Sequence, residues 1–185
     1  MRILGIDQSL TSSGLVVLDA GAIDLVETLK PGKVRGFQRV QMILDRAEAL
    51  ALDCDAVAME GPAMHAQGRA LTGLFGLYGC LTQRLWQVGR EPWIVSPTAR
   101  ARYATGKGNA GKDLVLASVI RRYDDERILG NDVADALVIA ALLARRLGEP
   151  LEAEGHLPKA CLDALEKVQA PEGWDERANT ARASQ

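Results

Sequence analysis

Over the first 60 residues, apolar positions come in short runs that turn-forming residues separate. Runs of this length, joined by brief polar links, are typical of strands in an antiparallel meander. We expect three such strands and a later fourth one, over residues 2–7, 15–18, 22–29 and 55–60. Between the third and the fourth strand, apolar residues recur at helical spacing from Gly36 to Leu52, which predicts an amphipathic helix.

Beyond residue 60 the pattern changes to long helical periods that one short strand interrupts. Helical spacing extends over residues 67–88, 112–123 and 132–147, and the strand covers residues 93–95. A glycine-rich loop, residues 106–111, precedes the middle one of these helices. Antiparallel strands followed by alternating strands and helices predict an α/β fold with a mixed central sheet flanked by helices.

After Gly148 the chain becomes polar and rich in turn-forming residues, which indicates a boundary. One short amphipathic helix is expected there, over residues 157–168, and the polar end beyond it is expected to fray. We therefore predict one main domain, residues 1–148, and a C-terminal extension, residues 149–185, with a short helix and a flexible tail.

The composition restricts the class of protein. The 185 residues suffice for about one domain, and a hydrophobic content of 48% excludes a disordered chain. No charge-free apolar run approaches the roughly 20 residues of a membrane span. The N-terminus lacks the pattern of a signal peptide, so we expect a cytoplasmic protein without membrane contact. Three widely spaced cysteines and two histidines argue against a disulfide scaffold and against a zinc site.

Four acidic residues stand at the ends of predicted elements. Asp7 and Glu60 each end an apolar strand, and Asp132 and Asp135 open the last helix, where residues three apart share one face. Taken singly, each has an ordinary interpretation as a turn-former, a strand end, a helix cap or a charge that compensates the helix dipole. If the two strands are neighbours, however, all four carboxylates meet at one end of the sheet and repel one another unless cations neutralise them.

Carboxylate oxygens as the only ligands suit Mg²⁺ or Mn²⁺ better than zinc. Two such ions about 4 Å apart can activate water and stabilise the leaving oxygen of a phosphodiester. The four acids therefore predict a site for hydrolytic phosphoryl transfer with two metal ions, Mg²⁺ being the expected cofactor and Mn²⁺ a substitute.

Basic residues gather between Pro97 and Lys112, a stretch without any acidic residue, although the net charge of the chain is −2. Lys112 opens a helix, where a lysine is unfavourable for the helix dipole, so we take it as the candidate that stabilises a scissile phosphate. The other basic residues of this stretch are Arg100, Arg102 and Lys107. A solvated basic loop is the alternative interpretation.

Several short motifs follow one another in a characteristic order. They are Ile3-Leu4-Gly5-Ile6-Asp7-Gln8-Ser9 through Gly14, Ala58-Met59-Glu60, Ser96-Pro97-Thr98, the segment from Thr105 to Lys112, and Asp132-Val133-Ala134-Asp135-Ala136-Leu137. Over about residues 1–147, this ordered set resembles the RuvC-type Holliday-junction resolvases, a branch of the RNase H-like fold, and is most similar to the bacteriophage-type members.

The resemblance implies a crossover junction endodeoxyribonuclease of DNA recombination and repair, from a bacterial cell or a phage. It implies a homodimer, formed through the long helix at residues 67–88, that binds four-way DNA junctions and nicks two opposing strands. It also implies that the four acids bind Mg²⁺ and that Lys112 is the catalytic basic residue.

The sequence departs from the family pattern at three places, the first being Asp7-Gln8-Ser9 where the family usually has Asp-Pro-Gly. The family's second lysine falls at Ala101, and we expect the flanking Arg100 and Arg102, together with Lys107, to contact phosphates of the DNA. The family often carries an aromatic wedge shortly after the strand-end glutamate. In this region the chain has Met64, either as an apolar wedge between bases or as an ordinary packed methionine.

Three other functions are compatible with parts of the pattern. An RNase H-like nuclease of relaxed specificity, acting on forks, flaps or other branched DNA, would use the same carboxylates. A non-catalytic junction-binding protein is disfavoured because all four acidic positions are filled. An actin- or hexokinase-type ATPase, which Gly5-Ile6-Asp7 also resembles, needs two lobes, and the chain is too short for both.

Overall fold

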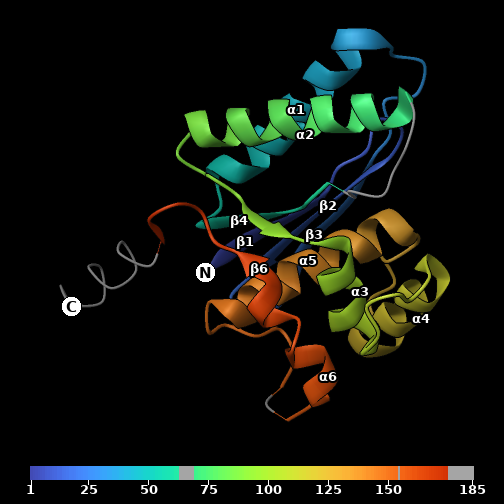
Figure 1. Ribbon diagram of the computed structural model, residues 1–185, viewed down its shortest axis with the longest axis vertical. Helices are drawn as coiled ribbons and strands as arrows, with labels where there is room; N and C mark the ends of the chain where they lie inside the picture. The colour runs from blue at the N-terminus through green and yellow to red at the C-terminus, as the bar shows by residue number, and fades with distance from the viewer. Residues whose placement is uncertain (63–68, 154, 175–185) are drawn as a thin grey trace.

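The computed structural model describes residues 1–62, 69–153 and 155–174, and a six-stranded mixed sheet lies at its centre (Figure 1). The strands, in their order across the sheet, are β3 (Ala22–Leu29), β2 (Ser13–Asp19), β1 (Arg2–Asp7), β4 (Ala56–Glu60), β5 (Trp93–Val95) and β6 (Val168–Gln169). The pairs β3–β2 and β2–β1 are antiparallel, β1, β4 and β5 run parallel, and β6 adds an antiparallel edge.

Helices cover both faces of this sheet (Figure 1). On one face lie α1 (Gly36–Leu52) and α2 (Arg69–Gln87), and on the other lie α3 (Pro97–Thr105), α4 (Lys112–Tyr123) and α5 (Asn131–Arg146). The mixed sheet between helical layers confirms the predicted α/β class. Among the helices described, none is long and apolar enough to cross a membrane.

The two hydrophobic layers follow from the alternation of side chains along β1. Ile3 belongs to the core under α5, while Leu4 and Ile6 belong to the core under α1 and α2. Helix α5 is the centre of the first layer, since every residue from Val133 to Ala144 is buried. Its close approach to β1 depends on Gly5, where a Cβ atom would lie 2.3 Å from the carbonyl oxygen of Ala136.

The sequence analysis did not predict α3, which fills the stretch between β5 and the glycine-rich loop. Its first turn is capped by Ser96, whose Oγ accepts a hydrogen bond from the Ala99 amide at 3.1 Å, and Pro97 stands at its first position. Most of its nine residues are small or polar and two are arginines, so they show little of the apolar periodicity on which helix prediction depends.

The segment after α5 packs against the same body. It forms a short helix, α6 (Lys159–Leu162), and a 3₁₀ turn (Leu165–Lys167) before β6 pairs with β5. Cys161 and Ala164 are buried in the core under α5, and the Trp174 ring meets Trp93 edge-on at 5.2 Å. The division of the chain at residue 148 stays a prediction.

A buried carboxylate strengthens this attachment. Glu152 accepts hydrogen bonds from the hydroxyls of Tyr103 at 2.8 Å and Tyr123 at 2.5 Å, and from Arg145 at 3.0 Å. Burial and the Glu152 charge raise the pKa of both tyrosines, which therefore remain neutral donors at physiological pH. The segment is thus bound to α3, α4 and α5 by a polar network as well as by apolar contacts.

Candidate functional site

Two acidic side chains meet at one end of the sheet because their strands are parallel neighbours. Ile6 of β1 is in register with Met59 of β4, so Asp7 and Glu60 follow side by side at the carboxyl ends of these strands. Gln8 joins the two strand ends, since its Nε2 donates a hydrogen bond to the carbonyl oxygen of Glu60 at 2.7 Å. Asp7 is buried, and Glu60 is partly buried.

Helix α5 brings the other two acids to the same end. Asp135 is 1% exposed, and Asp132 accepts a hydrogen bond from Ser12 Oγ at 2.5 Å. Helix α5 is capped by Gly130 without a side-chain hydrogen bond, so the structure does not use Asp132 as a helix cap. Gly14 of β2, the partner of Asp7 in the sheet, lies directly against the backbone of Asp132.

Arg100 of α3 lies among these carboxylates. Its Nε donates a hydrogen bond to Glu60 Oε1 at 2.6 Å, and its Nη1 donates to Asp135 Oδ1. The Arg100 residue is only 7% exposed. From the sequence, Arg100 was expected to contact phosphates. Since α3 was not predicted, the sequence did not indicate the direction of this side chain. The contact with phosphate stays a prediction, and the ion pairs with Glu60 and Asp135 are an observation that the sequence did not offer.

The carboxylates disturb one another electrostatically. Burial is the main cause that raises the pKa of Asp7 well above its usual range, and the charges of Glu60 and Asp135 raise it further. Burial also raises the pKa values of Glu60 and Asp135, although the Arg100 charge and its hydrogen bonds oppose this. The ionised site is therefore unfavourable unless a further cation binds.

Lys112 stands at the open side of the site. Its Nζ is 3.9 Å from Asp135 Oδ2, and 61% of its side chain is exposed. Gly111, at the end of the glycine-rich loop, is the cap residue before it. A lysine so placed can reach both the carboxylates and a ligand in solvent.

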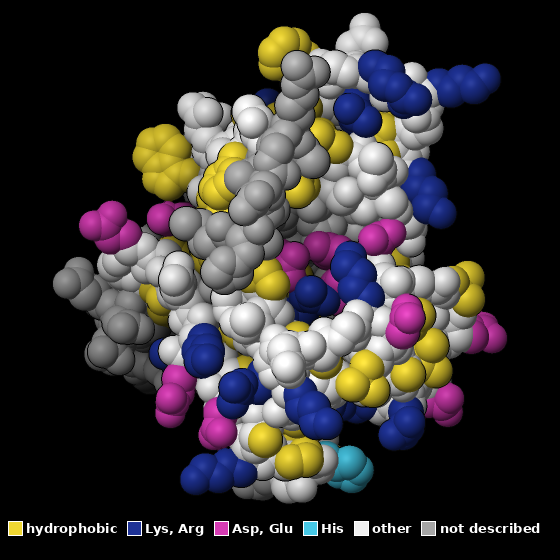
Figure 2. All heavy atoms as spheres, turned by 45° about the vertical axis from the view of Figure 1, so that its right-hand side comes forward, with side chains coloured by type: hydrophobic (Ala, Val, Ile, Leu, Met, Phe, Trp, Pro, Cys, Tyr) yellow, Lys and Arg dark blue, Asp and Glu magenta, His cyan; other side chains and the backbone are white. Residues whose placement is uncertain are grey.

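The remaining predicted residues lie farther out or outside the described part. Arg102 is partly buried on α3 and Lys107 is exposed in the loop after it. Met64 belongs to residues 63–68, which lie outside the described residues. In the space-filling view, acidic and basic side chains meet in a recess at the middle of one face (Figure 2).

The oxygen donors fit a hard divalent cation in their chemistry. Asp135 Oδ2 is buried and has no hydrogen-bond partner, so it has a lone pair available for a ligand. Among the residues that the structure describes, however, no group of three acidic, histidine or cysteine side chains is already arranged around one metal position. The carboxylate oxygens are therefore suitable ligands for such an ion. The Arg100 side chain, however, and not a preformed metal cavity, lies between them.

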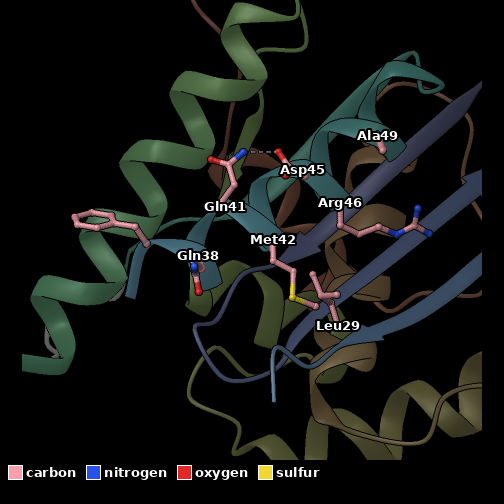
Figure 3. Close-up of a pocket in the computed structure, with 8 residues that line it drawn as sticks. Leu29, Gln38, Gln41, Met42, Asp45, Arg46 and Ala49 are labelled. Atoms are coloured by element: carbon pink, nitrogen blue, oxygen red, sulfur yellow. Dashed lines mark hydrogen bonds between the residues drawn. The ribbon is translucent and has the colours of Figure 1, made fainter. Parts of the chain in front are cut away.

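A hollow elsewhere on the molecule has no comparable chemistry (Figure 3). It lies along α1, and its lining residues are Leu29, Phe37, Gln38, Gln41, Met42, Asp45, Arg46 and Ala49. Its polar side chains bond to near neighbours, as Gln41 Nε2 does to Asp45 Oδ1 at 2.6 Å. Because Gln41, Asp45 and Arg46 are already paired and the hollow is open, we do not assign a reaction to it.

No protein-family model and no curated protein matches the sequence. Among the solved structures that match its fold are two of RuvC. The Thermus thermophilus RuvC structure has a TM-score of 0.64 and 22% identity, covering 80% of this chain and 98% of that one. T. thermophilus RuvC in complex with Holliday junction substrate has a TM-score of 0.66 and 24% identity, covering 80% and 97%. The chain therefore has the RuvC-like α/β fold of the RNase H-like class that its motifs predicted.

Proposed function

We propose that this protein is a metal-dependent, structure-selective endonuclease that resolves Holliday junctions by paired nicks in opposing DNA strands. One observation carries the proposal: acids from β1, β4 and α5, of which Asp7 and Asp135 are buried, meet at one sheet end in a fold similar to that of a RuvC bound to a Holliday junction. Four separate sequence positions are needed for this convergence, and each lies where an element ends or begins.

The residues of the site take the following roles in this proposal. Asp7, Glu60, Asp132 and Asp135 hold Mg²⁺, or Mn²⁺ in its place, with two ions in the working site. When bound, the ions supply an activated water and neutralise charge on the leaving oxygen. The raised pKa of Asp7 supports this role, because a carboxylate that is costly to ionise alone gains most from a bound cation.

Lys112 stabilises the negative charge that develops on the phosphate under attack. Its exposed Nζ lies beside Asp135 and faces the solvent from which the DNA approaches. Arg102 lies in α3 and Lys107 in the loop after it, and both contact phosphates away from the cut. We also propose a homodimer through α2, whose Leu74, Phe75 and Trp86 are exposed apolar side chains.

The proposed substrate is tested with a panel of DNAs in Mg²⁺ that contains a four-way junction, a three-way junction, a flap, an RNA–DNA hybrid and linear duplex. We expect symmetric nicks in opposing strands of the four-way junction, about tenfold faster or more than cuts in the others, which corresponds to about 1.4 kcal/mol of discrimination. Equal cleavage of all branched DNAs would instead support a nuclease of relaxed specificity. Binding without cleavage would support a junction-binding protein.

Lys112→Ala should slow cleavage far more than it weakens binding. Loss of one charge-stabilising donor at a reacting centre typically costs 10²–10³ in rate, so we expect a decrease of about 100-fold at saturating DNA. Junction affinity, measured by fluorescence anisotropy in Ca²⁺, should change less than about threefold, since a single exposed phosphate contact contributes little. Lys107→Ala is the matched control, and it should leave the rate at saturation unchanged. Equal losses of rate and affinity in Lys112→Ala would make Lys112 a phosphate anchor.

A further inference from the structure

Arg100 has an unusual position for a basic residue in a DNA-binding region. A guanidinium that contacts phosphates needs access to solvent, yet Arg100 is 7% exposed. Two different nitrogens of its planar group donate to two different acids, Nε to Glu60 and Nη1 to Asp135. The side chain is therefore directed to the inside of the site.

The backbone around Arg100 holds this position firmly. The Arg100 amide donates a hydrogen bond to the carbonyl oxygen of Ser96 at 3.0 Å, in the capped first turn of α3. The neighbours Ala99 and Ala101 are both buried in the core under α5. Helix α3 cannot swing away without opening this core, so any change in the Arg100 contacts must come from the side chain itself.

The guanidinium offsets the repulsion between the acids. It forms ion pairs with both Glu60 and Asp135, so one positive charge lies between the two carboxylates. Removing one member of a buried ion pair leaves an uncompensated charge, which is strongly unfavourable. Arginine suits this task better than lysine, because its rigid fork can donate to two carboxylates at once.

The site nevertheless retains acceptors that Arg100 does not use. Asp135 Oδ2 is buried without a hydrogen-bond partner, and Lys112 Nζ approaches it only to 3.9 Å. Within the described residues, no hydrogen bond to the Asp7 carboxylate is formed. The Arg100 guanidinium therefore pairs with two of the acids. The Asp7 carboxylate and Asp135 Oδ2 remain available to another cation.

We propose that Arg100 is a positioning residue that acts as an internal cation, and that its bridge between Glu60 and Asp135 competes with divalent metal ions for these carboxylates. A metal ion that takes Glu60 or Asp135 as a ligand displaces one arm of the guanidinium. The bridge therefore lowers the affinity of the protein for metal ions. This inference rests on the proposed function, because it takes the same carboxylates as metal ligands.

The competition is tested by titrating Mn²⁺ into protein without DNA, using calorimetry, and by thermal melting with and without Mn²⁺. Arg100→Met keeps the length of the side chain but removes the charge and the donors. We expect Mn²⁺ to bind this variant about tenfold more tightly than the wild type, a difference of about 1.4 kcal/mol. We also expect its metal-free form to melt at a lower temperature, and Mn²⁺ to raise that temperature by more than it does in the wild type.

Arg84 offers a matched control. It also donates to two carboxylates, Glu48 at 2.5 Å and Asp45 at 3.2 Å, but these contacts join α2 to α1 on the other face of the sheet. Arg84→Met should leave Mn²⁺ affinity unchanged. Arg100→Lys keeps the charge with a single donating group, so its affinity should lie between those of the wild type and Arg100→Met. The lysine variant carries the test if Arg100→Met fails to fold.

The outcomes separate this inference from the proposed function. If Asp7→Asn abolishes Mn²⁺ binding, but neither Arg100 variant binds Mn²⁺ more tightly than the wild type, the competition is overturned and the metal site stands. If Asp7→Asn leaves Mn²⁺ binding unchanged, the metal site itself is wrong, and the role of Arg100 falls with it. Tighter binding in both Arg100 variants, with no change in Arg84→Met, supports the competition.

Discussion

Asp7→Asn should abolish cleavage of a four-way junction and, at the same time, make the metal-free protein more stable at alkaline pH. The rate should decrease by about 10³-fold or more, because the variant lacks the Asp7 carboxylate. In the proposed site this carboxylate holds the cations that compensate the charge of the reacting phosphate. Binding of the junction, measured by anisotropy in Ca²⁺, should remain within about threefold of the wild type, since most affinity for DNA comes from phosphate contacts elsewhere.

The gain in stability follows from the burial of Asp7. Burial and the neighbouring acids raise the pKa of Asp7 in the folded state, so folding favours the neutral carboxyl. A raised pKa contributes stability at low pH, and that contribution is lost as the pH rises through the folded-state pKa. Asparagine has no charge to bury, and the advantage of the variant should therefore be largest near pH 8 and shrink as the pH falls.

The gain is measured as the difference in melting temperature between Asp7→Asn and the wild type, in EDTA, from pH 8 down to pH 5. Each pKa unit of the shift corresponds to about 1.4 kcal/mol, and for a chain of this size each kcal/mol raises the melting temperature by about 2–4 °C. Asp163→Asn, at the exposed residue that ends α6, is the control and should change neither rate nor stability. Wild-type cleavage by Asp7→Asn, or a loss of stability at pH 8, would contradict the assignment of Asp7.

If Asp7→Asn is more stable but inactive, the Asp7 carboxylate lowers the stability of the fold and is needed for activity. Buried like charges destabilise a protein, and such groups persist mainly where function requires them. Asp132 differs, because its hydrogen bond to Ser12 already stabilises it. The stability test therefore distinguishes Asp7, which destabilises the fold and is explained by function, from Asp132, which also forms a stabilising hydrogen bond.

The sequence predicted the parts of this site that depend on local pattern. Asp7 and Glu60 are visible because each ends an apolar run, and an acid at the end of a buried strand is unusual in itself. The position of Arg100 could not be predicted, because α3 has no clear apolar face and the partners of the side chain come from β4 and α5. Likewise β6 has two residues, and only its pairing with β5 makes it a strand.

The geometry of the site also depends on Gly14, which ends the first sequence motif but has no role that the sequence alone indicates. Gly14 pairs with Asp7 across β1 and β2, and its open face lies against the backbone of Asp132. A Cβ atom at Gly14 would lie 1.9 Å from the carbonyl oxygen of Asp132 and 2.4 Å from its carbonyl carbon. Neither atom belongs to a flexible side chain, so the start of α5 would have to move.

Gly14→Ala should therefore destabilise the protein and disable the site together. We expect a loss of about 3 kcal/mol or more in the free energy of unfolding, at the upper end for overpacking, because backbone rather than side chain must give way. Chemical denaturation measures this loss. Cleavage at a temperature where the variant is folded should also decrease by at least about 100-fold, since small displacements of catalytic groups have effects of this size.

Gly76→Ala is the matched control for the added methyl group. Gly76 lies in α2, and a Cβ atom there would meet nothing within 4 Å. Alanine in a helix is more favourable than glycine by about 0.5–1 kcal/mol, so this variant should be more stable than the wild type. The same change from glycine to alanine thus lowers the free energy of unfolding at Gly14 and raises it at Gly76. The reason is that only Gly14 lies against the backbone of Asp132. If Gly14→Ala has the free energy of unfolding and the cleavage rate of the wild type, this contact does not determine where α5 places its acids relative to Asp7.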